Sequence, residues 1–257
     1  MEFDGRTVLI TGAAGGIGAA AAAAFAAEGA SLALVDLDRS ALEKVAAGLG
    51  VDDARVLLHV ADVRDEQQVE GYVAATRDRF GAIDVFFNNA GVEGATGPLV
   101  DTDLETVDTI LSVNVRGSFL GLKHVLRVMT AQGHGSVVNT SSMAGVIAFA
   151  GLGGMYTASK HAVVGLTRVA AVEAAPAGVR VNAVCPGPVD TRMMRSIENG
   201  MSPDDIPGVQ EQFAGLTALK RYADPAEIAS VVLFLASDRA SYVSGSIYTV
   251  DAGMTGI

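Results

Sequence analysis

The stretch Thr7-Val8-Leu9-Ile10-Thr11-Gly12-Ala13-Ala14-Gly15-Gly16-Ile17-Gly18 joins a short apolar run to a glycine-rich turn. An alanine-rich run follows, and alanine is the best helix former, so the order is strand, turn, helix. Glycines in such a turn let the backbone approach a pyrophosphate, which the N-terminus of the helix then stabilises. The spacing of Gly12, Gly16 and Gly18 therefore predicts a dinucleotide site at the start of an α/β fold.

The rest of the chain alternates short β-branched runs with longer helical runs. The predicted strands are residues 7–10, 31–35, 55–60, 85–87, 136–139, 179–184 and 246–250. The predicted helices are residues 16–28, 40–49, 66–80, 104–113, 115–129, 155–174 and 225–237, with a looser region at 187–219. Because such alternation builds right-handed βαβ units, it predicts a Rossmann-like, doubly wound, seven-stranded parallel sheet with helices on both faces.

Composition points to one domain with a large core. Hydrophobic residues make up 50% of the 257 residues and charged residues only 18%, and no linker interrupts the chain. We expect a single domain over residues 1–257, in which 1–100 mainly bind the cofactor and 101–257 mainly serve catalysis, substrate binding and subunit contacts. The net charge of −11 argues against nucleic acid and anionic membrane surfaces as partners.

Two uncharged stretches, residues 7–27 and 135–159, could suggest membrane segments. Both are interrupted by glycines or polar residues, so neither is the apolar run of about 20 residues that a membrane span needs. The acidic start of the chain is also unlike a signal peptide. We therefore expect a soluble, cytoplasmic protein without membrane contact.

Cysteine and histidine usage gives no sign of an oxidising compartment or of a metal site. Cys185 is the single cysteine, so no disulfide can form within the chain. The four histidines show no metal-ligand spacing and are interpreted as structural or surface residues: His59, His124, His134 and His161.

Two aspartates mark the ends of predicted strands. Asp36 ends the second strand, where a carboxylate accepts hydrogen bonds from both ribose hydroxyls and would repel a 2′-phosphate, so NAD is predicted over NADP. Asp62 follows the third strand, where its carboxylate could reach an adenine amino group. Each aspartate could instead be a helix N-cap. Arg39 could contact a phosphate, but Asp36 and Asp38 flank it, which disfavours that contact.

Tyr156 and Lys160 lie four residues apart within a predicted helix, so their side chains share one face. A nearby ammonium favours the phenolate, so the pKa of Tyr156 is expected to fall below that of free tyrosine. A phenol with such a pKa is an effective acid–base catalyst near neutral pH. By itself this spacing is common, but Asn114 and Ser142 lie upstream and strengthen the interpretation.

Over almost its full length the chain resembles the short-chain dehydrogenase/reductase family. The matching signatures are Thr11-Gly12-x-x-x-Gly16-x-Gly18, Asn88-Asn89-Ala90-Gly91, Asn114, Ser142, Tyr156-x-x-x-Lys160 and Pro186-Gly187-Pro188-Val189-Asp190-Thr191. The resemblance implies that Tyr156 is the general acid/base, that Lys160 lowers its pKa and holds the nicotinamide ribose, and that Ser142 binds the substrate oxygen.

The resemblance also implies supporting roles. Asn114 would hold a helix kink and a water, Asn89 would lie near the adenosine ribose, and Val189 and Thr191 would hold the nicotinamide carboxamide. The expected cofactor site comprises Gly12, Gly16, Ile17, Gly18, Asp36, Leu37, Asp62, Val63, Asn89, Tyr156, Lys160, Val189 and Thr191. Ser141 is the alternative catalytic serine, but Ser142 fits the signature better, although it lies fourteen residues before Tyr156.

The predicted function is therefore NAD-dependent hydride transfer between a secondary alcohol and its ketone. A 3-oxoacyl-acyl-carrier-protein reductase is the alternative enzyme, but Asp36 and the net negative charge argue against it. A non-catalytic NAD-sensing protein is the alternative of another class, although it need not keep all four catalytic positions.

The substrate is expected to be small and apolar, with cyclic alcohols or ketones included. The segments 93–96, 143–155 and 188–216 would form its pocket, with Val146, Ile147, Phe149, Leu152, Met193, Met194 and Met201 as apolar members. Val92-Glu93-Gly94 also resembles reductases of cyclic ketones. Apolar residues on nearly every side of 162–172, together with apolar 115–129 and 247–257, predict a homotetramer.

Overall fold

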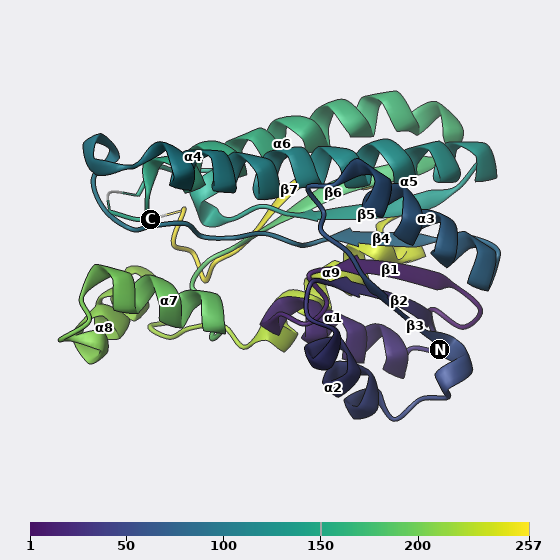
Figure 1. Cartoon of the computed structure of the whole chain (residues 1–257), viewed down its shortest axis with the longest axis horizontal. Helices are drawn as coiled ribbons and strands as arrows, with labels where there is room; N and C mark the ends of the chain where they lie inside the picture. The colour runs from purple at the N-terminus through teal and green to yellow at the C-terminus, as the bar shows by residue number, and fades with distance from the viewer. Residues whose placement is uncertain (150, 257) are drawn as a thin grey trace.

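The computed structural model describes residues 1–149 and 151–256, and its centre is one parallel sheet (Figure 1). The seven strands lie in the order β3-β2-β1-β4-β5-β6-β7. Their bounds are β1 Thr7–Thr11, β2 Ser31–Asp36, β3 Val56–Val60, β4 Val85–Asn88, β5 Gly135–Thr140, β6 Val179–Pro186 and β7 Ile247–Val250. The chain reverses its direction of winding between β1 and β4, so the predicted fold class is confirmed.

Helices cover both faces of the sheet. The helices are α1 Gly16–Ala27, α2 Arg39–Leu49, α3 Glu66–Phe80, α4 Leu104–Ile110, α5 Ser118–Gln132, α6 Gly154–Ala174, α7 Arg192–Met201, α8 Ile206–Leu216 and α9 Pro225–Ala236. Short 3-10 turns occur at η1 Asp53–Arg55, η2 Leu99–Asp101, η4 Met143–Gly145, η5 Ala175–Ala177 and η6 Asp238–Ala240. In Figure 1, α1, α2 and α9 lie below the sheet, and α3, α5 and α6 lie above it.

The core follows from the alternation of side chains along each strand. Val8 and Ile10 of β1 face Phe25 of α1 and Val232 of α9, and all are fully buried. Leu9, between them, points to the other face and packs in the cluster that contains α3, α5 and α6. Strands that are buried on both faces read as continuous apolar runs, which is why β1 was recognisable in the sequence.

Two regions differ from the sequence-based prediction. The separate helices predicted at 104–113 and 115–129 are one continuous run, in which a π-helical segment, η3 Leu111–Gly117, joins α4 to α5. The region at 187–219 is not loose, because it contains α7 and α8, whose N-termini are capped by the side chains of Thr191 and Asp205. Within the described residues, no helix has the length and apolar character to span a bilayer.

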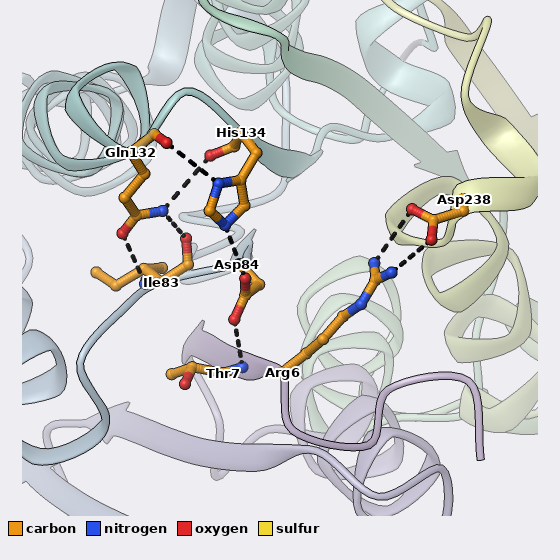
Figure 2. A network of polar contacts seen from close by, with 7 residues as sticks. All are labelled: Arg6, Thr7, Ile83, Asp84, Gln132, His134 and Asp238. Carbon is orange, nitrogen blue, oxygen red and sulfur yellow. Dashed lines mark hydrogen bonds and ion pairs between the residues drawn. The ribbon is translucent and has the colours of Figure 1, made fainter.

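Polar contacts line a smaller cavity of about 360 Å³ at the amino-terminal edge of the sheet (Figure 2). Asp84 accepts a hydrogen bond from the Thr7 amide at 2.7 Å, and the imidazole of His134 lies 3.1 Å from the other oxygen of the same carboxylate. Arg6 pairs with Asp238 beside them. His134 is therefore half-exposed and structural, as predicted, and the opposite, carboxyl edge is left to form the main cavity.

Candidate active site

A cavity of about 760 Å³ opens at the carboxyl ends of the central strands. This is the place where doubly wound sheets bind ligands, at the reversal of winding between β1 and β4. Most of the predicted site residues line it, namely Gly12, Gly16, Ile17, Asp36, Leu37, Asp62, Val63, Asn89, Ser142, Tyr156, Lys160, Val189 and Thr191. Gly18 and Asn114 do not line it, and they act on the site through their neighbours.

The glycine loop lets the chain turn and pack closely. Gly12 has a φ of +64°, and a Cβ there would lie 2.9 Å from the Cα of Ala90. A Cβ on Gly18 would lie 2.1 Å from the carbonyl oxygen of Gly12, so Gly18 lets α1 pack back on the turn rather than touching a ligand. The N-terminus of α1 has no side-chain cap, so its N–H groups remain available for a phosphate.

Asp36 holds the glycine loop and faces the cavity. Its carboxylate accepts hydrogen bonds from the amides of Ala14 at 3.0 Å and Leu37 at 2.7 Å. The N-cap of α2 is Asp38, so the alternative interpretation of Asp36 as a cap is wrong. Arg39 pairs with Glu43 at 2.8 Å on the exposed face of α2, so its charge is engaged there.

Asp62 has a partner that the sequence analysis did not consider. The guanidinium of Arg64 lies 2.6 Å from its carboxylate and holds the pKa of Asp62 below the ordinary range. Asp65, not Asp62, caps α3. Arg64 lines the cavity as well, so an adenine amino group would meet an Asp62–Arg64 pair rather than a free carboxylate.

Asn89 and Thr191 border the loop from either side. The Asn89 amide donates to the carbonyls of Thr11 and Gly12, each at 3.2 Å. The Thr191 hydroxyl accepts a hydrogen bond from the Met194 amide at 3.3 Å and so caps α7. A Cβ on Gly16 would lie only 2.7 Å from the methyl group of Thr191, so the glycine leaves room for this side chain. Both residues thus fix the walls of the cavity, whatever they contact in a ligand.

Asn114 lies in the π-helical segment and is almost completely buried. Its side-chain amide accepts the Val92 amide and donates to the Val92 carbonyl, both at 2.8 Å, and it also donates to the Ser159 hydroxyl at 3.0 Å. π-helical segments of this kind occur frequently at functional sites. Asn114 thereby ties the segment before it to α6, which carries Tyr156 and Lys160.

The two neighbouring serines have different partners. The Ser141 hydroxyl donates to the main-chain carbonyl of Lys160 at 2.9 Å and is fully engaged in holding α6. The Ser142 hydroxyl accepts the Ala144 amide at 3.2 Å and lies near enough to the Tyr156 phenol to lower its pKa. The geometry therefore favours Ser142 over Ser141 as the group beside the reacting atoms.

The pKa of Tyr156 differs from the expectation. Burial raises it to about 12; the hydrogen bond from Ser142 favours the phenolate, and the charge of Glu93 opposes it. Burial also lowers the pKa of Lys160 to about 8. The predicted fall in the pKa of Tyr156 is therefore wrong for the protein alone, because the loss of water around the phenol disfavours the charged phenolate. The phenol is neutral at neutral pH and able to donate a proton.

The far end of the cavity is apolar. Its wall is formed by Met143, Leu152, Met193, Met194, Ile197, Phe213 and Met254. Leu152, Met193 and Met194 were predicted, whereas Ile147, Phe149 and Met201 pack behind the wall and Val146 is exposed. Phe213 lies in the predicted segment 188–216, although it was not named, whereas Met254 was missed, because only the return of the C-terminal turn brings it to the pocket.

One group among the described residues could hold a cation. Glu66 and Glu70 on α3 and His124 on α5 bring ligand atoms within 4.8 Å of one another. Two different helices contribute them, so spacing along the chain did not reveal the cluster. Lys123 already pairs with Glu66 at 2.5 Å, and its positive charge opposes a metal ion there.

Comparisons with known proteins agree with this geometry. A family model described as enoyl-(acyl carrier protein) reductase matches residues 12–255. Levodione reductase from Leifsonia aquatica is 47% identical over 99% of this chain and 96% of its own. A crystal structure of levodione reductase has a TM-score of 0.96 at 46% identity, covering 98% of both chains.

Two further relatives extend the range of substrates. A 2,5-dichloro-2,5-cyclohexadiene-1,4-diol dehydrogenase from Sphingobium indicum is 37% identical over 100% of this chain and 99% of its own. The structure of an NAD⁺-bound xylitol dehydrogenase has a TM-score of 0.92 at 37% identity, covering 98% of this chain and all of that one. Given the family match over nearly its whole length, the chain belongs to the short-chain dehydrogenase/reductase family of oxidoreductases.

Proposed function

We propose that this enzyme transfers a hydride between NAD(H) and a secondary alcohol or its ketone, with Tyr156 as the general acid/base. The observation that carries the proposal is one continuous cavity with Asp36 at one end and Ser142, Tyr156 and Lys160 at the other. A dinucleotide fits such a cavity because its ribose and its reactive ring must reach opposite ends. In this arrangement residues 1–100 mainly serve the cofactor, and later residues serve catalysis.

The residues present fit NAD. The glycine loop and the uncapped N-terminus of α1 would hold the pyrophosphate, and Asp36 would accept the ribose hydroxyls while repelling a 2′-phosphate. The NAD⁺-bound relative supports this choice of cofactor. When bound, the nicotinamide supplies or accepts the hydride. Lys160, Val189 and Thr191 border the same cavity and are the groups proposed to hold that end.

The protein groups handle the proton. In ketone reduction, the neutral phenol of Tyr156 donates its proton to the substrate oxygen, and the Ser142 hydroxyl holds that oxygen in place. The ammonium of Lys160 stabilises the phenolate that remains. In alcohol oxidation the same groups act in reverse. Asn114 acts as a positioning residue, because it fixes Val92 and the α6 helix that carries the pair.

The substrate is proposed to be an apolar alcohol or ketone, including cyclic ones. Methionine, leucine and phenylalanine form the wall beside Tyr156, which suits an apolar body with a single polar group. Unbranched methionines adapt to different shapes. The dehydrogenase that acts on a chlorinated cyclohexadienediol supports a cyclic substrate.

An NAD-coupled screen of cyclic and linear secondary alcohols and ketones tests the function. We expect turnover of cyclic, apolar members with NAD(H). Turnover of none, with NAD still bound, would support the non-catalytic sensor instead. Preference for acyl-carrier thioesters with NADPH would support the alternative reductase.

A homotetramer is proposed from apolar residues left on the surface of the single chain. On α6, Val169 is half-exposed and Val172 is 77% exposed, and Phe119 of α5 is half-exposed. These exposed apolar side chains lie on two helices, α5 and α6, and a second copy of the chain would cover them. The apolar C-terminal stretch 247–257 remains the proposed second surface, as a D2 tetramer requires. A cytoplasmic location stays a prediction.

A further inference from the structure

Residues 191–222, here called the lid, leave the main body and return to it at neighbouring points. The amide of Asp190 donates to the Ala223 carbonyl, and the amide of Ala223 donates to the Pro188 carbonyl, both at 2.9 Å. Between these two hydrogen bonds the chain forms α7 and α8, which stand apart from the other helices (Figure 1). The two ends of the lid are therefore joined at its base, and the Ala218 amide within the lid also donates to the Ala252 carbonyl of the main body at 2.8 Å.

The inner face of the lid is part of the substrate wall. Met194 and Ile197 come from α7 and Phe213 comes from α8, and all three line the cavity. Phe213 also stacks on Phe149 of the main body, with ring centres 5.9 Å apart. The shape of the pocket thus depends on how α7 and α8 are placed relative to each other.

One buried carboxylate connects the two helices. Glu198 follows Ile197 on α7 and has an exposed fraction of 0%. One of its oxygens accepts hydrogen bonds from Arg195 at 2.6 Å and from Gln210 of α8 at 2.8 Å. Arg195 in turn donates to Asp190 at 2.7 Å and lies over the ring of Tyr222, 5.4 Å from its centre. Glu198 is therefore linked to α8 and, through Arg195, to both ends of the lid.

The hydrogen-bonded link from Glu198 of α7 to α8, here called the brace, is not the simplest way to fill the space between the two helices. A buried carboxylate loses its hydration, and an apolar side chain of similar volume often stabilises a fold equally well. Within the described residues, the second oxygen of Glu198 makes no hydrogen bond of normal length, and burial together with this neighbouring carboxylate raises the pKa of the Tyr222 phenol, so part of this cost is uncompensated. What the carboxylate provides is direction, since the hydrogen bond from Gln210 fixes one arrangement of α8 against α7, while Arg195 of α7 holds the carboxylate in place.

We propose that Glu198 is a positioning residue that holds α7 and α8 as one rigid lid, so that Met194, Ile197 and Phe213 meet the substrate together. The expected effect on KM rests on the proposed function, whereas the structural link between α7 and α8 does not depend on it. Loosening the lid removes apolar contacts made equally to substrate and transition state, so it raises KM and leaves kcat nearly unchanged.

The substitution Gln210→Met tests the brace, with Gln212→Met as its matched control on the same helix. Gln210 donates to Glu198, whereas Gln212 is exposed. We expect Gln210→Met to raise KM for the ketone about fivefold to tenfold, with kcat within about twofold and the affinity for NADH unchanged. The control should match the wild type. Equal KM values for the two variants would overturn the proposal.

Variants of Glu198 test the carboxylate itself, and proteolysis then tests the lid independently of the proposed function. Glu198→Met should raise KM as Gln210→Met does. Glu198→Gln should keep KM close to the wild-type value, because its amide oxygen can still accept both hydrogen bonds. Trypsin reports on the lid without any substrate, since Arg192, Lys220 and Arg221 are exposed within it. Cleavage there should be faster in Gln210→Met than in Gln212→Met. Equal cleavage rates would refute a rigid lid even if no substrate were found.

Discussion

The ammonium of Lys160 lies 5.6 Å from the centre of the Tyr156 ring and donates a hydrogen bond to the Thr140 carbonyl at 3.1 Å. Both side chains are buried, and burial disfavours the charged form of each. At neutral pH the phenol is neutral while most of the lysine remains protonated. These are the protonation states that the proposed role of the pair requires: a phenol that can give a proton and an ammonium that can stabilise the phenolate.

This relationship predicts how ketone reduction depends on pH. The pKa of Lys160 is lowered to about 8, so its positive charge is present below that pH and lost above it. We expect kcat/KM for reduction to fall as the pH rises through about 8, since this parameter reports the pKa values of the free enzyme. Lys160→Arg keeps the charge at high pH and should lose this step, whatever its absolute rate. A wild-type profile that stays flat up to pH ~10 would contradict this role of Lys160, because that pH lies well above its lowered pKa and the positive charge would already be lost.

Replacing Asp36 should weaken NAD binding more than catalysis. Asp36→Ala removes the acceptor for the ribose and for the Ala14 amide, and hydrogen bonds to a charged group contribute about 1.5–3 kcal/mol. We expect KM for NAD to rise about tenfold to a hundredfold, and the preference over NADP to narrow. Asp103→Asn, at the cap of α4 and outside the cavity lining, should leave this preference unchanged. Equal kcat/KM values of the wild type with NADP and with NAD would contradict the assignment of NAD as the cofactor.

Two glycine substitutions should have opposite effects on the free energy of unfolding. In Gly18→Ala the new methyl group would lie 2.1 Å from the Gly12 carbonyl oxygen, so the turn must open and both stability and NAD affinity should fall. Gly48→Ala places a methyl group in open space within α2 and should stabilise by about 0.5–1 kcal/mol. Urea unfolding of both variants measures the difference. A Gly18→Ala protein as stable as the wild type would exclude the close packing seen here.

The oligomeric state should depend on the exposed face of α6. Light scattering at micromolar concentration should give the mass of a tetramer for the wild type. Val172→Glu puts a charge into the proposed interface and should shift the protein towards smaller species. Val60→Glu, at an exposed position on β3, is the control and should not. A wild-type enzyme that is a stable, active monomer would end the proposal.

The sequence predicted every strand within a few residues, because strands buried on both sides have a clear apolar pattern. It placed a break between two helices at Asn114, where the family resemblance implied a kink. It did not reveal the π-helical form of this segment, because the Val92 groups that satisfy the Asn114 amide lie far away along the chain. It also did not show α7 and α8, whose caps Thr191 and Asp205 are ordinary residues in a polar stretch.

Site chemistry was harder to predict than site position. The four-residue spacing correctly brought Tyr156 and Lys160 together, but it carries no information about burial, which decides both pKa values. Likewise, sequence alone could not tell whether Asp36 or Asp38 caps α2. Met254 could not be assigned to the pocket, because only tertiary structure returns the C-terminal turn to it.

The most direct test is the turnover of Tyr156→Phe with a ketone found in the screen. Phenylalanine keeps the buried ring but removes the proton, so kcat should fall by about 10²–10⁴-fold. NADH binding, followed by fluorescence, should survive because the glycine loop and Asp36 are untouched. Tyr242→Phe, at a fully exposed position, should match the wild type. A Tyr156→Phe enzyme that binds NADH and turns over at nearly the wild-type rate would contradict the role of Tyr156 as the proton donor.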